Sequence, residues 1–291
     1  MFATTEQFGF LVRGARWTQM LKQVRRALPR RVSRRVRLWT QWQEVAQQSW
    51  RTLYIVSSLR HLTDEEELSS LKECGVGSEC RFLAFVDELP TESIPEHLFR
   101  LRVRSGERLH LAQRRDEDEI RSLLRRFLQG LGSGSGEPTV ADAWWESDRF
   151  VVLSPSFERL RVPLGSLPAQ FQTAHREILE RFQIDQYGDF VYWPRLEVHM
   201  GWDQLAQAAD PMARLQAEQR SADFNSRYAT AIRALRKSSG LTQRDIKGLD
   251  ERTVRRIEQG QTRATANAIA KLAKAHRMET SEYMAELSRR L

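Results

Sequence analysis

The chain has 291 residues and a formal net charge of +8, with 41% hydrophobic and 29% charged residues. This length allows two or three domains, each with a core of its own. No apolar run approaches the roughly 20 residues that cross a bilayer, so a membrane-spanning protein is not expected. Cys74 and Cys80 have neither the spacing of a zinc site nor the number needed for a disulfide framework, which favours a cytoplasmic protein.

The positive charge lies at the two ends of the chain. Residues 1–50 carry ten Lys and Arg against two Asp and Glu, and residues 221–291 carry fifteen against eight. The residues between them are mildly acidic. We therefore expect a polyanion to meet the ends of the chain rather than its middle.

Residues 1–50 are expected to form a basic amphipathic helical segment. Apolar residues recur at helical spacing from Trp17 to Leu28, and Pro29 ends that helix. A second helix is predicted with Val36, Trp39 and Trp42 on one side. No carboxylate occurs between residues 8 and 43.

Two interpretations of this acid-free stretch remain open. One is a second nucleic-acid contact, to RNA or DNA, with Trp39 and Trp42 as stacking platforms. The other is a pair of helices packed on the next module, with arginines that are only solvated. The candidate contact residues are Arg13, Arg16, Lys22, Arg25, Arg26, Arg30, Arg31, Arg34, Arg35 and Arg37.

Residues 51–130 are predicted to form an α/β module of unknown role. Strands are expected at 53–57, 81–88 and 98–106. Residues 116–128 form a predicted helix, with acids in its first turn and arginines in its last, as the helix dipole favours. The Gly- and Ser-rich residues 131–139 are predicted to be a flexible linker.

Residues 140–212 are predicted to form a second small α/β domain. Its run GDFVYWPRLEVHMGWDQL, within residues 144–208, resembles a family of small bacterial domains of unknown function with a Trp-Pro-x-Leu-Asp signature. The matching residues are Gly188, Val191, Trp193, Pro194 and Leu196, while Glu197 replaces the Asp. The resemblance implies an antitoxin-like protein, often paired with a helix-turn-helix. It does not indicate any chemical activity. We interpret Trp193 and Trp202 as core residues rather than a ligand cage.

Residues 221–291 read as helices throughout. The first ends at Gly240, and a very short second helix carries Gln243 and Ile246. The third, at 251–259, has only Val254 and Ile257 as apolar positions. Two more helices are predicted, one from about residue 266 and one around residues 283–287. At 100° per residue the face of the third helix opposite its apolar pair holds Arg252, Arg255, Arg256 and Gln259.

This pattern resembles the Cro/repressor-like (XRE-type) helix-turn-helix over residues 224–291. The matching residues are Arg236, Leu241-Thr242-Gln243 and Ile257-Glu258-Gln259-Gly260. The resemblance implies a buried ion pair between Arg236 and Glu258. The segment from Gln243 to Ile257 is about three residues shorter than is usual, so helix two must be clipped.

The same resemblance implies a set of DNA contacts. Gln243 would lie beside a phosphate and the first bases, and Arg252 and Arg256 would read base edges with Glu251. Arg255 and Arg263 would contact phosphates. The full candidate set is Gln243, Arg244, Glu251, Arg252, Thr253, Arg255, Arg256, Gln259, Thr262 and Arg263.

We therefore predict a multi-domain α+β protein: a bacterial, cytoplasmic, nucleoid-associated transcriptional regulator, antitoxin-like or autoregulatory. Its partner would be double-stranded DNA, bound as a homodimer, with RNA or a protein as further candidate partners of the N-terminal and middle modules. The alternative is a nucleic-acid-binding subunit of a larger antiviral-defence or ribonucleoprotein complex. No metal-ligand spacing, GxSxG elbow or phosphate-binding glycine loop occurs, so no cofactor, metal or enzymatic activity is expected.

Overall fold

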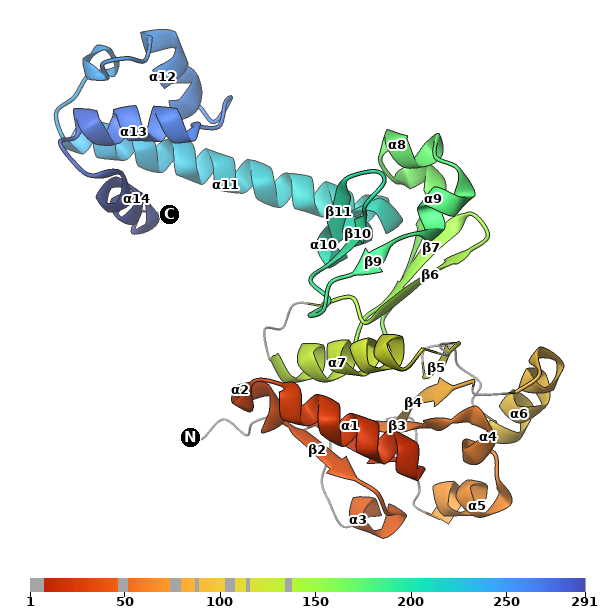
Figure 1. Ribbon diagram of the computed structural model, residues 1–291. Coiled ribbons are helices and arrows are strands. Elements are labelled where there is room, and N and C mark those ends of the chain that lie inside the picture. Colours follow the sequence, from red (N-terminus) through yellow and green to blue (C-terminus); the bar gives the residue numbers. More distant parts are fainter. Residues whose placement is uncertain are drawn as a thin grey trace. The chain divides into compact units, whose positions relative to one another are not determined.

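The computed structural model describes residues 8–46, 52–73, 80–86, 89–102, 108–113, 116–133 and 138–290. The chain divides into two compact units, residues 1–209 and 210–291. Unit 1 contains three sheets with surrounding helices, and unit 2 is helical (Figure 1). The predicted multi-domain α+β architecture is confirmed.

Unit 1 begins with a five-stranded parallel sheet in the order β2-β1-β3-β4-β5. Successive strand residues point to opposite faces, and here both faces are covered. Phe10 and Val12 of β1 belong to one buried cluster, whereas Leu11 belongs to another. Such a sheet is doubly wound, in the order known from flavodoxin-like folds. The strands are β1 (Phe8–Val12), β2 (Val36–Trp39), β3 (Leu53–Ser58), β4 (Cys80–Phe85) and β5 (Leu109–Ala112).

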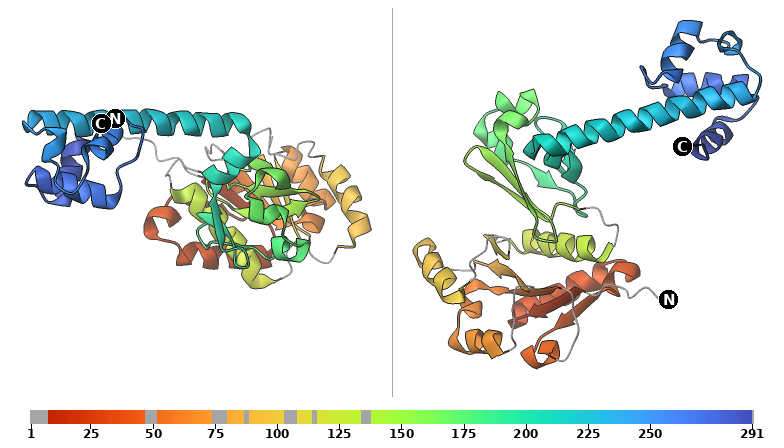
Figure 2. Two further views of the ribbon diagram at one scale, coloured as in Figure 1. Left: turned by 90° about the horizontal axis from the view of Figure 1, so that it is seen from above. Right: turned by 180° about the vertical axis from the view of Figure 1, so that it is seen from behind.

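Helices cover this sheet on both sides (Figures 1 and 2). On one face α1 (Ala15–Ala27) and α7 (Glu117–Ser133) pack together, and the short α2 (Arg30–Ser33) packs on α7. The other face is covered by α3 (Trp42–Ala46), α4 (Leu59–Leu62), α5 (Glu65–Glu73) and α6 (Ile94–Leu101), with a short 3₁₀ turn, η1 (Thr91–Ser93), before α6.

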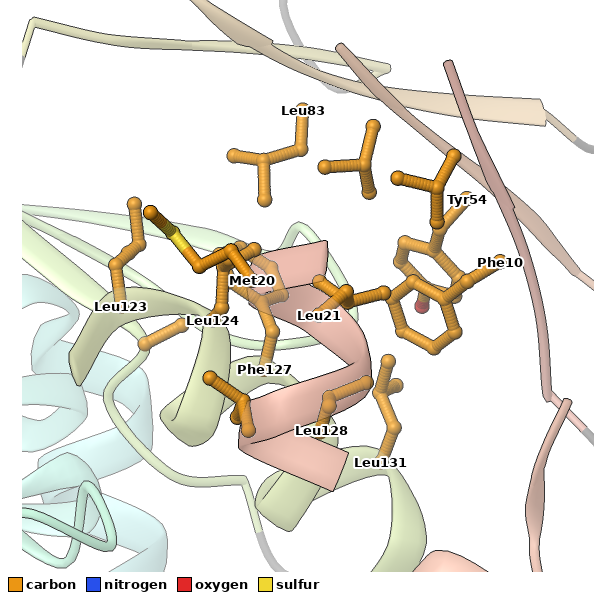
Figure 3. Packing of buried hydrophobic residues seen from close by; sticks show 14 of the residues in the cluster. Phe10, Met20, Leu21, Tyr54, Leu83, Leu123, Leu124, Phe127, Leu128 and Leu131 are labelled. Carbon is orange, nitrogen blue, oxygen red and sulfur yellow. The ribbon is translucent and has the colours of Figure 1, made fainter. Parts of the chain in front are cut away.

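The core between the sheet and helices α1 and α7 is shown in Figure 3. Met20 and Leu21 of α1 meet Leu124 and Phe127 of α7, and all four side chains are buried. The apolar face predicted for α1 is therefore confirmed.

Two predicted elements of the N-terminal half are wrong. Residues 36–39, expected in a helix, form strand β2, which pairs with β1 through Phe8↔Val36 to Leu11↔Trp39. Residues 98–101, expected in a strand, are the last turn of helix α6, and residues 103–106 lie outside the described residues. In both segments the apolar spacing suits either element, and packing on the sheet selects one.

At the carboxyl edge of the sheet, an ion pair between the partly buried Arg13 and the buried Glu67 joins the ends of several elements. Arg13, which follows β1, donates from Nε to Glu67 Oε1 of α5 at 2.9 Å and also donates to the Thr40 carbonyl. Trp42 Nε1 donates to the same carboxylate at 2.9 Å. Burial favours a raised pKa for Glu67, but the bonds from Arg13 and Trp42 outweigh it and lower the pKa. Arg13 and Trp42 therefore have partners inside the protein.

The rest of unit 1 is two three-stranded antiparallel sheets with short helices. Trp193 is fully buried, packs edge-on against Phe150 and Phe171, and donates to the Leu179 carbonyl at 3.0 Å. Trp202 is buried too, so their interpretation as core residues is confirmed. The strands are β6 (Asp142–Glu146), β7 (Arg149–Leu153), β8 (Arg159–Pro163), β9 (Gln183–Ile184), β10 (Phe190–Trp193) and β11 (Val198–Gly201). The helices are η2 (Leu164–Ser166), α8 (Ala169–Gln172), α9 (Arg176–Glu180) and α10 (Trp202–Ala209).

The segment that precedes these sheets is helical for longer than expected. Helix α7 continues to Ser133 with Leu131 buried, so residues 131–133 are not part of a linker. Residues 134–137 lie outside the described residues. Beyond them, Asp142 accepts a hydrogen bond from His110 Nε2 at 2.8 Å, and both side chains are buried. Contacts of this kind make residues 1–209 one compact unit.

Unit 2 is built on one long helix, α11 (Pro211–Ser238). It is followed by the 3₁₀ turn η3 (Gln243–Asp245), α12 (Glu251–Glu258), α13 (Ala266–Ala275) and α14 (Thr280–Ser288). Ile232, Ile257, Leu272 and Leu287 bring one side chain from each of the four helices into a single core, which Ile246, directly after η3, completes. Among the described residues, no helix is both long and apolar enough to cross a membrane.

The glycine of the Trp-Pro-x-Leu segment has a steric role that can be tested. Gly188 has φ +81°, its carbonyl accepts from Val140 N at 2.7 Å, and an added Cβ would lie 2.4 Å from the Val140 oxygen. Gly188→Ala should lower the free energy of unfolding by roughly 1–3 kcal/mol. Gly165→Ala is the matched control, because nothing lies within 4 Å of its added Cβ. Denaturant unfolding of both variants measures the difference, and equal stabilities would contradict this role.

Candidate DNA-binding surface

The local sequence of α12 defines both of its ends. Asp250 caps the first turn, accepting from Thr253 N at 2.7 Å and from its hydroxyl at 2.6 Å. Gly260 follows the last turn with φ +71°, a left-handed conformation that glycine adopts at least cost, and its N–H donates to the Ile257 carbonyl at 3.0 Å. Only Val254 and Ile257 turn apolar side chains into the core. The helix therefore exposes its opposite face.

The predicted ion pair between Arg236 and Glu258 is present. Arg236 Nε donates to Glu258 Oε1 at 2.5 Å and Nη2 donates to Oε2 at 3.0 Å, with side chains only 8% and 2% exposed. A buried charge without a partner is costly, so this fork joins the end of α11 to the end of α12. Burial favours a raised pKa for Glu258, but the bonds from Arg236 and Gln243 outweigh it and lower the pKa.

Gln243 belongs to the same network. Its Nε2 donates to Glu258 Oε2 at 2.8 Å, so the amide nitrogen is turned toward the ion pair. The helix that carries it is the single 3₁₀ turn η3, so the predicted clipping of helix two is confirmed. The chain then turns through Gly248, at φ +85°, whose carbonyl accepts from Lys271 Nζ at 2.8 Å.

Arg252 and Arg256 lie on the exposed face of α12, together with Gln259. Within the described residues, neither of these two arginines forms an ion pair, in contrast to their neighbours. Glu251 is held by Arg244 Nε at 2.8 Å and by Arg255 Nη2 at 3.5 Å. The hydrogen bond and charge of Arg244, and to a smaller extent Arg255, lower the pKa of Glu251.

The remaining candidate residues differ in whether their side chains are already hydrogen-bonded within the protein. Thr262 is exposed, whereas the Thr253 hydroxyl is bonded to the cap Asp250. Arg263 donates to Asn225 Oδ1 at 3.0 Å and to Ser221 Oγ at 2.6 Å, which attaches the loop after α12 to helix α11.

A cavity of about 230 Å³ opens beside the ion pair, and Arg233 and Arg255 contribute cations to its wall. Of its lining residues, Arg233 is the one that was not among the predicted site residues. The other lining residues are Arg236, Gln243, Glu258 and Gln259. Arg233 is exposed and lies three residues before Arg236, so it is on the same side of α11. That spacing is the sequence signal that could have identified it.

The N-terminal candidates fall into two groups. Arg13, Arg25 and Arg35 are partly buried, and Arg25 Nε donates to the Ser33 carbonyl at 3.2 Å. Trp42 is buried and Trp39 partly buried, so Trp42 is no stacking platform. The exposed candidates are Arg16, Lys22, Arg26, Arg30, Arg31, Arg34 and Arg37.

Comparison with known families agrees with this geometry. Residues 232–283 match the family model described as "Helix-turn-helix". No protein of curated function and no solved structure matches the chain. Residues 232–283 thus form a Cro/repressor-like (XRE-type) helix-turn-helix, which belongs to a DNA-binding family rather than an enzyme family. The protein is therefore a DNA-binding protein. The resemblance of residues 144–208 to the Trp-Pro-x-Leu family stays a prediction.

The lowered pKa of Glu258 predicts a specific pH dependence. Because the folded pKa lies below the ordinary value of 4.5, the contribution of the ion pair is complete above that value and is lost as the pH falls through the folded pKa. Glu258→Gln should therefore speed amide exchange in α12 at neutral pH, and its difference from the wild-type protein should shrink below about pH 4.5.

Hydrogen exchange measured by mass spectrometry on the full chain makes this comparison. Glu282→Gln is the control, because that exposed carboxylate lies in the same unit outside the ion pair. A difference between Glu258→Gln and wild type that is constant from pH 7 to about pH 3 would contradict the assignment.

Proposed function

We propose that the protein is a transcriptional regulator that reads a specific duplex sequence with the exposed face of α12. The observation that carries this proposal is the state of Arg252 and Arg256. Both are solvent-exposed and, in the described part of the chain, free of ion pairs, while other arginines around them have protein partners. Guanidinium groups that are not held by the protein are available to base edges.

The spacing of these arginines suits the major groove. Four residues along a helix rise by about 6 Å and nearly complete one turn, so Arg252 and Arg256 point the same way. Each can donate two parallel hydrogen bonds to a guanine, which is the most common specific contact in this groove. We therefore expect guanines at two nearby positions of the recognition site.

Phosphate contacts would come from the cavity beside the ion pair. Arg233 and Arg255 stand in its wall, and the Arg236–Glu258 pair and Gln243 form the rest of it. A backbone phosphate at this place would hold the docking position without specifying sequence. Gln243 would then act through Glu258, which it contacts, rather than through its amide nitrogen on DNA.

We further propose a homodimer that acts on its own operon in the manner of an antitoxin. Support comes from the helix-turn-helix, whose dimers read half-sites about one helical turn apart, and from the resemblance of residues 144–208. A homodimer predicts a symmetric footprint on the promoter and a sedimentation mass of twice 33.9 kDa. An asymmetric footprint from a monomer, with stable co-purifying proteins or RNA, would instead favour the subunit of a larger assembly.

Removing either arginine tests the base-reading role. Arg252→Ala and Arg256→Ala should each weaken binding to the cognate duplex by about 1–3 kcal/mol and relax selectivity at one base pair. Arg220→Ala is the matched control, because this exposed arginine of α11 lies outside the helix-turn-helix match. Titrations against cognate and random duplexes measure both effects. Equal losses on the two duplexes would contradict base reading.

A further inference from the structure

A basic groove in unit 1 has no part in the function proposed above. It has a volume of about 540 Å³ and runs along one face of helix α1 to the loop that follows β2. Its polar lining residues are Thr18, Gln19, Lys22, Gln23, Arg26 and Thr40. Every one of these side chains can donate hydrogen bonds, and none is a carboxylate.

The cations of the groove are available. Lys22 and Arg26 are exposed, lie one turn apart on α1, and form no ion pair within the described residues. Glu44, in the helix that follows Thr40, accepts from the backbone N–H groups of Thr40 at 2.9 Å and Gln41 at 3.0 Å. Those two bonds, with Lys22 as a smaller cause, lower the pKa of Glu44. Glu44 therefore holds the loop and leaves the groove with a net positive charge.

Hydrogen bonds hold the loop side of the groove in place. The Thr40 carbonyl accepts from Arg13, whose guanidinium is fixed by the buried Glu67, while the Thr40 N–H is fixed by Glu44. The opposite wall is helix α1, which is anchored in the core by Met20, Leu21 and Val24. With this backbone already held, Lys22 and Arg26 are the side chains that binding must order.

We propose that this groove, lined by Lys22 and Arg26, is a second binding site for the phosphate backbone of double-stranded DNA. Charge selects a polyanion, and the two cations stand about 6 Å apart along the helix, so they can meet neighbouring phosphates of one strand. No aromatic side chain is among the lining residues, Trp42 is buried, and the ring of Trp39 packs on Gly9, so the groove lacks the stacking platforms that single strands need. The site therefore adds affinity without sequence preference.

The salt dependence of binding to a random-sequence duplex tests this site in the full-length protein. Lys22→Gln together with Arg26→Gln keeps two helix-compatible side chains and removes two charges. Each neutralised phosphate contributes about 0.9 to the slope of log K against log salt, so the double variant should reduce the slope by about 1.8. Circular dichroism should be unchanged, because both side chains are exposed.

The matched control removes one arginine and one lysine from the other face of the same sheet. Arg60 of α4 and Lys72 of α5 are exposed there, so Arg60→Gln with Lys72→Gln makes the same change in net charge. Its slope should equal that of the wild-type protein. If the groove variant also keeps the wild-type slope, or if the two double variants lower it equally, the proposed site is wrong.

The test is independent of the base-reading proposal. The same pair of groove substitutions should reduce the slope by the same amount when Arg252 and Arg256 are also replaced by Ala, since those arginines would act at a separate surface. Failure of base reading would appear as unchanged discrimination between cognate and random duplex. Failure of the groove would appear only in the slope. Stronger binding of single-stranded than of double-stranded DNA at the groove would also overturn the assignment to duplex.

Discussion

The buried fork between Arg236 and Glu258 is the interaction on which the DNA-binding unit depends. It is formed by two charges that are almost completely removed from water, and each is tolerated only because the other is bonded to it in the correct geometry. The pair connects the last turn of α11 to the last turn of α12. Gln243 is a further donor to Glu258, so the pair also holds the 3₁₀ turn η3, which takes the place of the second helix of the motif. The direction of α12, and so of its exposed arginines, follows from these bonds.

Unit 1 also has an arginine–glutamate ion pair, at the carboxyl edge of its parallel sheet. Ligands of doubly wound sheets bind outside the carboxyl ends of the strands, where the strand order reverses. In this protein the order reverses between β1 and β3, and the Arg13–Glu67 pair with Trp42 stands beside that point. The arginine that follows β1 is therefore structural. The cations available to a partner lie instead on the outer face of α1.

The basic side chains of both units fall into two groups: those bonded to other groups of the protein and those that are free. Arg13, Arg236 and Arg263 each have protein partners that attach one element to another. Arg252, Arg256 and Lys22 are exposed and, among the described residues, unpaired. Both groups count equally in the net charge, but only the second group is free to contact phosphates and so to release counterions from DNA. A charge count from sequence therefore overstates the number of contacts that a nucleic acid can receive.

The sequence by itself determined the elements whose information is local. The polarity of α12 and the Gly260 that follows it belong to the local sequence, and the helix-turn-helix pattern identified the Arg236–Glu258 pair, whose members are 22 residues apart. Only the tertiary structure decided that residues 36–39 form a strand, because parallel pairing with β1 competes with a helical pattern of similar spacing. It also decided the role of Arg13, whose partner Glu67 is 54 residues away. Side-chain periodicity reports the geometry of one element, whereas a buried partner depends on which elements meet.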